Sequence, residues 1–343
     1  SLIQPYGIAA DNNFYMTNHQ DLIFVPEVEL RDNQRMAEEN PVRVEVERAV
    51  AKVVVSGVPE VVPHGDRIDN LKWGLDVTNM YTYWMRKMTF IANSGGVPNE
   101  MEQLNAGYRE ERYAEDPNFT RFSSWNGGNP VGQFEYLSGT PELSKNFDDY
   151  DYTLENTMDA ADQRHDVTTR VVISGTYTPN GFGSVATRNG GGISFYYFKG
   201  NAIRVEAMRD MVNDRGQIPQ ELRDAGLEQA IENVLAWNPN AFNSPTVSFS
   251  EGGIHFYYQG VCYYTVLIRH FSNNMVPVLM GYGRYGVVRN NVYQLSINKI
   301  IGPGQPVINP PGTDPDDEDT SWISADVNIM RWYIRNQNVE ELL

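Results

Sequence analysis

The sequence predicts an all-β protein, and three observations predict it. Apolar and polar residues alternate in several short segments, as they do along a strand with one buried and one wet face. Other runs are rich in Val, Ile, Tyr, Phe and Thr and end at Gly or Asn. Clear helical spacing of apolar residues is confined to residues 219–236. We therefore expect sheets to form the core and helix to be limited to an insertion.

The N-terminal part predicts two strands. Residues 21–30 alternate except at Pro26, which favours an edge position, and residues 42–46 alternate apolar with charged side chains. After Glu47 the apolar positions shift from even to odd numbers, and a strand pattern shifts in this way only at a bulge or a change of partner sheet. We place a domain junction at Glu47 and Arg48.

Five later segments have strand character. Trp73, Tyr293, Leu295 and Ile297 lie at the apolar positions of two of them, so we expect these side chains in the core of the main sheet structure. The expected strands are residues 71–77, 171–176, 193–198, 261–271 and 292–301.

The connections are polar. Residues 105–166 show little periodicity and predict surface loops over a β core. Residues 302–320 are rich in Pro, Gly and Asp, which predicts a flexible tether that does not pack a core. An isolated strand follows, in which Ile323, Ala325, Val327 and Ile329 alternate with polar residues.

The composition excludes several classes of protein. An apolar content of 41% over 343 residues supports a folded core. The formal net charge of -17 repels phosphate backbones, so nucleic acid is not an expected partner. The single cysteine, Cys262, allows neither an intrachain disulfide nor a thiolate zinc cluster. No apolar run reaches the length of a membrane-spanning helix.

No pattern in the sequence predicts catalysis, a cofactor or a metal. Residues 281–286 match GxGxxG, but a strand-like run follows them instead of the helix that a dinucleotide site needs. The acidic run 314–319 lacks the turn glycine and the final glutamate of a calcium loop. The histidines show no metal-ligand spacing. We therefore predict a protein that is not an enzyme and name no catalytic, cofactor or metal residue.

Three aromatic runs allow two interpretations. Residues 195–198, 256–258 and 263–264 would suit a platform on which a sugar stacks, but Tyr and Phe are also ordinary strand residues. We favour core packing and cross-strand pairing over a glycan site.

Five motifs, in order along the chain, resemble the fimbrillin superfamily, the type V pilins of Bacteroidales. Residues 46–53 look like the junction between the two domains of that family. The other four are 71–73 with Asn79 and Tyr83, 171–179, 288–293 with 297–302, and the Pro/Asp tract with the strand 322–332. Within the family the chain is most similar to shaft subunits of the minor (short) fimbria of Porphyromonas-type bacteria. Residues 90–250 match only in patches, and Arg331 stands before Trp332 where the family often has Pro.

The resemblance implies a transthyretin-like Greek-key β-sandwich with helical and loop insertions, together with the remnant of a second β domain. It also implies export as a lipoprotein, trimming by an arginine-specific protease and polymerisation by donor-strand exchange. Since the family has a whole domain before the junction, we expect this chain to be a fragment that lacks most of it. The expected units are 1–47, 48–301, the tether 302–320 and the C-terminal strand segment 321–343.

The C-terminal segment is the expected donor. Its anchors would be Ile323, Ala325, Val327, Ile329, Trp332 and Ile334. An equally weighted alternative is that 322–332 completes the chain's own sheet and only 333–343 is free.

The resemblance implies a structural subunit of a cell-surface fimbria attached to the outer membrane, which supports adhesion and binds copies of itself and other fimbrial subunits. The alternative is a tip or accessory adhesin that binds a host or bacterial surface ligand. A shaft subunit must both donate and accept a strand, whereas a tip protein need only accept one.

Overall fold

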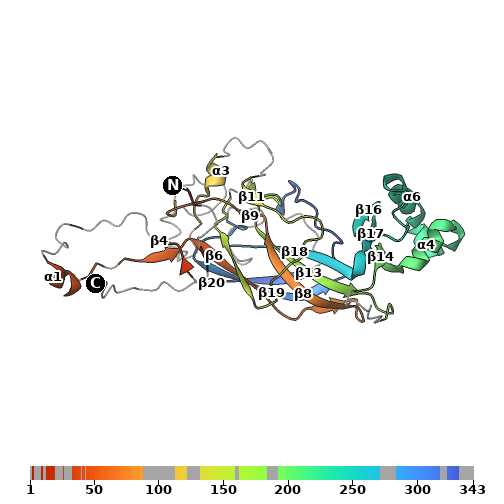
Figure 1. Cartoon of the computed structure of the whole chain (residues 1–343), viewed down its shortest axis with the longest axis horizontal. Coiled ribbons are helices and arrows are strands. Elements are labelled where there is room, and N and C mark those ends of the chain that lie inside the picture. The colour runs from red at the N-terminus through yellow and green to blue at the C-terminus, as the bar shows by residue number, and fades with distance from the viewer. Residues whose placement is uncertain are drawn as a thin grey trace.

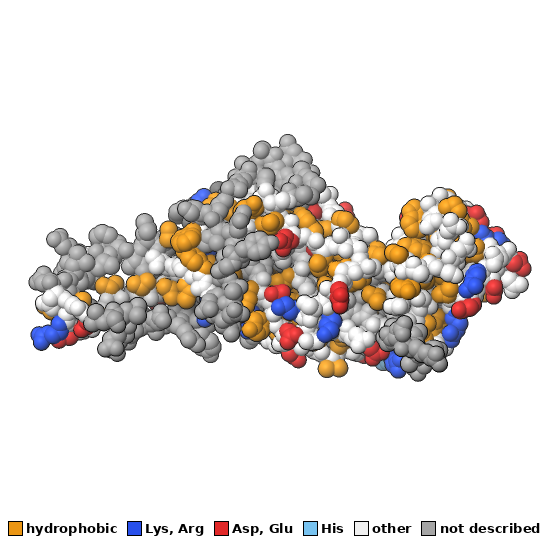
Figure 2. All heavy atoms as spheres, in the orientation of Figure 1, with side chains coloured by type: hydrophobic (Ala, Val, Ile, Leu, Met, Phe, Trp, Pro, Cys, Tyr) orange, Lys and Arg blue, Asp and Glu red, His pale blue; other side chains and the backbone are white. Residues whose placement is uncertain are grey.

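The computed structural model has an elongated, strand-rich body with a cluster of helices at one end (Figure 1), where charged side chains lie at the surface (Figure 2). It describes residues 2–3, 9–10, 13–19, 26, 33–39, 41–42, 44–87, 113–121, 132–158, 162–183, 192–270, 283–316 and 323–331. The fold is all-β, as predicted, with a helical insertion.

A five-stranded sheet forms one layer of the body. Its order is β12-β6-β19-β20, and β7 lies beside the C-terminal half of β19. The central strand β19 runs parallel to β6 and β7 and antiparallel to β20. The strands are β6 (Val50–Ser56), β7 (Glu60–Val62), β12 (Tyr150–Leu154), β19 (Asn291–Ile301) and β20 (Ile323–Arg331).

A three-stranded antiparallel sheet forms the second layer. Its order is β18-β13-β8, with β8 (Arg67–Asp76), β13 (Arg170–Thr178) and β18 (Val261–Leu267). One buried cluster joins the two layers, because it takes Val53 and Leu295 from the first sheet and Trp73, Ile173 and Cys262 from the second. The body is therefore a β-sandwich.

The four residues expected in the core are all buried. Trp73, Tyr293 and Leu295 are fully buried, and Ile297 is 1% exposed. The alternation along β8 and β19 is therefore confirmed as the pattern of strands with one face in the core.

A four-stranded sheet, β15-β14-β17-β16, carries the helices at the far end of the body (Figure 1). Its strands are β14 (Phe195–Phe198), β15 (Asn201–Arg204), β16 (Phe249–Glu251) and β17 (Ile254–Tyr257). The helices are α4 (Val205–Asn213), η3 (Arg215–Gln217), α5 (Gln220–Asp224) and α6 (Leu227–Trp237), and the short turn η4 (Tyr258–Gly260) joins β17 to β18.

The aromatic runs divide between two cores. Phe195 and Tyr257, paired in register, stack at 4.7 Å and belong to the core of the sandwich. Their neighbours Tyr196 and Phe256 pair on the opposite face, where they pack with the helices. Core packing is thus confirmed for these side chains, whereas Tyr258 remains half-buried.

The predicted helix 219–236 is two helices, because Gly226 interrupts it. Gly226 has φ +90°, a left-handed conformation that ends α5 and caps α6. The first helix of the insertion, α4, was not predicted. It buries only Met208 and Met211, so its apolar stripe is too short to stand out from the charged residues around it.

The N-terminal part contains several short strands. Val46–Arg48 forms β5, which pairs with β4 (Met16–Asn18), so the strand expected at 42–46 begins later than predicted. The expected strand 21–30 lies outside the described residues except for Pro26. The remaining short elements are β1 (Leu2–Ile3), β2 (Ala9–Ala10), β3 (Asn13–Phe14), α1 (Gln34–Glu39), β9 (Thr78–Asn79), β10 (Thr82–Tyr83), α3 (Pro117–Arg121) and β11 (Phe134–Glu135).

Two expectations about connecting segments were wrong. The predicted loop region 105–166 contributes a strand, β12, which pairs with β6 and forms an edge of the first sheet. The predicted tether is packed over residues 302–316: Ile308 is buried with Leu143, Val172 and Tyr263. Backbone hydrogen bonds hold this tract to Val62, Tyr263 and Gly139, which satisfies polar groups that a solvated arm would give to water.

Candidate assembly site at the C-terminal edge strand

The strand β20 lies at the edge of the first sheet, beside the central strand β19. Leu295 pairs in register with Val327, and Ile297 pairs with Ala325. Residues directly opposite each other in an antiparallel pair point to the same face of a sheet. Since Leu295 and Ile297 are buried in the sandwich core, this register directs Val327 and Ala325 to that core, and both are partly buried against it.

The register brings four of the predicted donor residues into line with β19. Besides Ala325 and Val327, Ile323 pairs with Ile300 and Ile329 with Tyr293, with one bulge between Ile297 and Lys299. Trp332 and Ile334 lie outside the described residues. In this chain, therefore, β20 completes its own sheet, and its role as a donor to another subunit stays a prediction.

Within the described residues, the outer edge of β20 has no strand beside it. Among the strand pairs of the described residues, β20 appears only with β19. Such an edge presents backbone N–H and C=O groups that can pair with a further extended segment. The edge is thus open to addition of a strand as well as to replacement of β20.

The predicted domain junction lies at the start of the sandwich. β5, which includes Glu47 and Arg48, pairs with β4, and β6 pairs with β12 and β19 from Val50 onward. A change of partner therefore accompanies the shift in apolar phase. The assignment of this point as a boundary between domains remains a prediction.

Glu47 is a fully buried carboxylate with two cationic or polar neighbours. Its oxygens accept hydrogen bonds from Arg86 at 3.1 and 2.8 Å, and His19 Nδ1 lies 3.1 Å from Oε2. His19 directly follows β4, so this contact ties the N-terminal segment to the junction. Arg48 has its backbone N–H 3.3 Å from Asn290 Oδ1, immediately before β19.

A second buried pair adjoins the first. Arg289 is fully buried, and its Nε donates to Glu155 Oε2 at 3.0 Å. Its Nη2 also donates to Thr82 Oγ1 and to the carbonyl of Tyr83, each at 2.8 Å. Arg86 Nη2 lies 3.3 Å from the Arg289 carbonyl and so connects the two pairs. The network fixes the ends of β5, β10, β12 and β19 against one another.

The electrostatics of the network favour an ionised Glu47. Burial by itself raises the pKa of Glu47, but the charge of Arg86, the hydrogen bond from His19 and the charge of Arg289 outweigh it. The pKa of Glu47 is therefore below its ordinary value. A carboxylate of this kind stabilises the fold above its unfolded pKa, and the contribution is lost as the pH falls through the folded pKa.

We expect Glu47→Gln to destabilise the fold at neutral pH and to make little difference at acidic pH. The reason is that protonated Glu47 resembles Gln, whereas ionised Glu47 binds Arg86. Denaturant unfolding of both proteins from about pH 7 to pH 3 measures the difference. Subtracting the two curves is essential because Asp116, whose pKa burial raises well above its ordinary value, contributes in the opposite sense. A difference that stays constant with pH would contradict the assignment.

The sequence analysis missed His19, Arg86, Glu155 and Arg289. They are far apart along the chain, and no spacing connects them. No local signal marks them: Arg289, for example, is followed by Asn290 and Asn291, a polar context that is also typical of an exposed arginine.

The described residues contain no group of three His, Cys, Asp or Glu side chains that could hold a metal ion. Within the same part of the chain, every helix falls short of the length and apolar character needed to cross a membrane. The candidate site is therefore the edge strand β20 beside β19, with the buried ion-pair network at the start of β19.

The fold defines an all-β sandwich protein with an edge strand at its C-terminal side. Residues 255–338 match the family model described as major fimbrial subunit protein type IV, fimbrillin, C-terminal. This match covers β18, β19 and β20, so the C-terminal region of the chain is similar to the fimbrillin family. No curated protein matches the chain in sequence.

Three solved structures are similar to this one. A fimbrilin from Porphyromonas gingivalis W83 has 16% identity and a TM-score of 0.35, with 86% of this chain and 61% of that chain covered. Two proteins assigned to cell adhesion, from Parabacteroides distasonis ATCC 8503, have 14% and 11% identity and TM-scores of 0.30 and 0.32. They cover 85% and 84% of this chain, which spans 55% and 60% of their lengths. The likeness to the fimbrillin family rests on the C-terminal sequence match.

Proposed function

We propose that this chain is a structural subunit of a cell-surface fimbria and polymerises by donor-strand exchange through β20. The observation that carries the proposal is the fimbrillin match over residues 255–338, since that segment contains both β20 and its partner β19. The same proposal places the fimbria on the outer membrane and derives the subunit from a lipoprotein precursor. The subunit binds copies of itself and other fimbrial subunits.

The exchange replaces one strand by an equivalent strand. If β20 leaves its sheet, β19 loses a row of backbone hydrogen bonds, and the core next to Leu295 and Ile297 loses the cover of Val327 and Ala325. A neighbour's β20 restores both, because it offers the same alternation in the same register. The contacts between β20 and β19 stay the same, but the two strands then belong to different chains.

The length of chain before β20 limits the geometry of this exchange. Asp316 is buried, and Thr168 Oγ1 donates to it at 2.6 Å, so the tract is held at that point. Residues 317–322 join Asp316 to β20, and at about 3.3 Å per residue they span roughly 20 Å when extended. The donor therefore reaches a subunit in close contact with its own, unless 302–316 is also released.

We expect truncation after Asp319, made in the full-length processed protein, to give a folded subunit that does not extend a filament through its donor end. Loss of β20 removes the strand that occupies the neighbour's sheet. Electron microscopy measures filament length, and circular dichroism reports folding. Folded truncated protein that still forms filaments of normal length would show that the donor lies elsewhere.

We also expect Val327→Asp to weaken assembly, because burying an unpaired carboxylate costs several kcal/mol. Val58 offers a matched control, since its side chain is 96% exposed and Val58→Asp adds the same charge without burying it. Filaments from the Val58 variant should equal those of the wild type. Equal assembly by both variants would contradict a buried role for Val327.

A further inference from the structure

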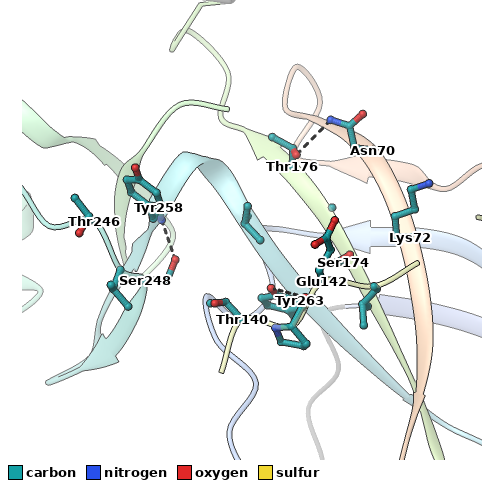
Figure 3. Close-up of a pocket in the computed structure, with 15 residues that line it drawn as sticks. Asn70, Lys72, Thr140, Glu142, Ser174, Thr176, Thr246, Ser248, Tyr258 and Tyr263 are labelled. Atoms are coloured by element: carbon teal, nitrogen blue, oxygen red, sulfur yellow. Dashed lines mark hydrogen bonds between the residues drawn. The ribbon is translucent and has the colours of Figure 1, made fainter. Parts of the chain in front are cut away.

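A groove of about 440 Å³ lies between the sandwich and the helical end of the molecule (Figure 3). Its floor is the outer face of the sheet β18-β13-β8, and its walls are the segments 140–143 and 246–248 together with Tyr258. This volume is typical of a small-ligand site. The groove is separate from β19 and β20, so the proposed assembly does not use it.

The floor of the groove is polar because strand alternation puts the apolar residues of β13 on the other face. Ile173 and Tyr177 belong to the sandwich core, whereas Ser174 and Thr176 face outward. Ser174 pairs in register with Lys72 on one side and Tyr263 on the other, which forms a row across the sheet.

A bulge exposes the end of this row. The register between β13 and β8 shifts between Ser174 and Thr176, and Asn70, opposite the shift, has φ +56°. A bulge bends its strand and redirects side chains. Here it brings Asn70 Nδ2 to 3.5 Å from Thr176 Oγ1 at the rim of the groove (Figure 3).

Several polar groups in the groove are unused. Within the described part of the chain, no protein partner is found for the hydroxyls of Thr140, Ser174, Thr246 and Tyr258 or for the carboxylate of Glu142. By contrast, Tyr263 donates to the Pro141 carbonyl at 3.1 Å and Ser248 accepts from the Tyr258 N–H at 2.9 Å. These five groups line the groove from β13, from the segments 140–143 and 246–248 and from η4, and Thr140, Glu142 and Thr246 are exposed (Figure 3).

Apolar groups make up most of the lining of the groove, and they include Pro141 and Leu143. The half-buried ring of Tyr258 and the partly exposed side chain of Val261 lie among the hydroxyls, and Val247 at the rim is 68% exposed. A ligand with both hydroxyl groups and apolar C–H faces matches such a lining, because the rings and methyl groups cover the C–H faces while the side-chain oxygens bind the hydroxyls.

The charges and strand edges argue against other ligands. Lys72 and Glu142 give one charge of each sign, so the groove does not select an anion. An extended peptide would need an unpaired strand edge, but β13 is central, and Gln305 exchanges two backbone hydrogen bonds of 2.8 Å with Tyr263 on β18.

We propose that this groove binds a neutral carbohydrate. Glu142 and the hydroxyls of Thr140, Ser174 and Thr246 hydrogen-bond the sugar hydroxyls, and Tyr258 covers a sugar face. The site serves recognition, and filament assembly is a separate property of β20.

The test uses saturation-transfer NMR and titration calorimetry of the full chain with neutral oligosaccharides containing glucose, galactose, mannose or N-acetylglucosamine. We expect binding of at least one of them, weakened about tenfold or more by Glu142→Ala and by Tyr258→Ala, which is the loss expected when a charged hydrogen bond or a stacking contact is removed. The matched controls are Glu135→Ala and Tyr150→Ala, exposed residues of the same types outside the groove.

The result has two informative forms. Binding that the groove variants lose and the controls keep, with all five proteins equally folded by circular dichroism, supports the proposal. If no oligosaccharide binds at millimolar concentration, or if the groove variants bind as tightly as the wild type, the proposal is wrong. Filament formation is measured independently, so either outcome leaves the test of β20 intact.

Discussion

Replacing Arg289 with Met is expected to lower the free energy of unfolding by about 3–5 kcal/mol, the usual cost of removing one partner from a buried ion pair. The side chain of Arg289 is completely buried, so neither water nor salt ions screen its charge. Met has a similar length but leaves Glu155, which is 1% exposed, without its cation. Thr82 Oγ1 and the Tyr83 carbonyl lose their donor as well.

The exposed pair Arg35–Glu39 supplies the control. Its side chains are 83% and 59% exposed, so Arg35→Met should change stability by less than about 1 kcal/mol. The double variant Arg289→Met, Glu155→Gln should recover part of the loss, because it removes the unpaired charge. Denaturant unfolding measures all four proteins. A loss at Arg289 no larger than that at Arg35 would show that the buried pair does not hold the strand ends together.

Replacing Leu295 with Ala is expected to cost about 2–5 kcal/mol, the range for a large-to-small change at a fully buried position. Leu295 lies at the middle of β19, between Val55 on β6 and Val327 on β20, so the cavity would open where three strands meet. Thermal and denaturant unfolding report the loss.

The same strand provides the control for this substitution. Ile301, the last residue of β19, is 44% exposed, and Ile301→Ala should cost much less than the change at Leu295. Equal effects at the two positions would mean that the face of β19 assigned to the core is incorrect.

Alternation along the chain predicted the strands that have one face in the sandwich. It succeeded for β6 and β19, which bury every second residue over most of their length. The first four residues of β13 are all buried, and that strand was predicted from its content of β-branched residues. Alternation failed for β12, where only Thr153 and Leu154 are buried and the remaining residues read as loop. An edge strand covered on so little of its length leaves no periodic pattern.

The sequence did not predict the packing of residues 302–316 or the ion-pair network, and the reason is the same for both. The Pro, Gly and Asp content predicts a solvated tether, but Ile308 packs with Leu143, Val172 and Tyr263. Gly302, Pro303, Gly304 and Pro306 of the same tract are buried as well. Likewise Glu47 meets Arg86, and Glu155 meets Arg289, only after the sheets have formed. Such partners are set by tertiary structure and leave no local trace. The register of β20 beside β19, by contrast, brought the expected donor residues opposite the core positions, although their use between subunits is untested.

The parallel pairing of β6 with β19 sets the timing of folding. Lys52 pairs with Val292, roughly 240 positions further along the chain, and long-range parallel pairing of this kind is slow because loop closure precedes any gain from contacts. When the chain is made from its N-terminus, β6 waits without its central neighbour until almost all of the sequence has emerged. Once β19 has paired with β6, its other edge is open until β20, which follows it in the sequence, has been made. In the interval between those two events the edge of β19 is vacant, so a strand that paired with it then would have no resident strand to displace.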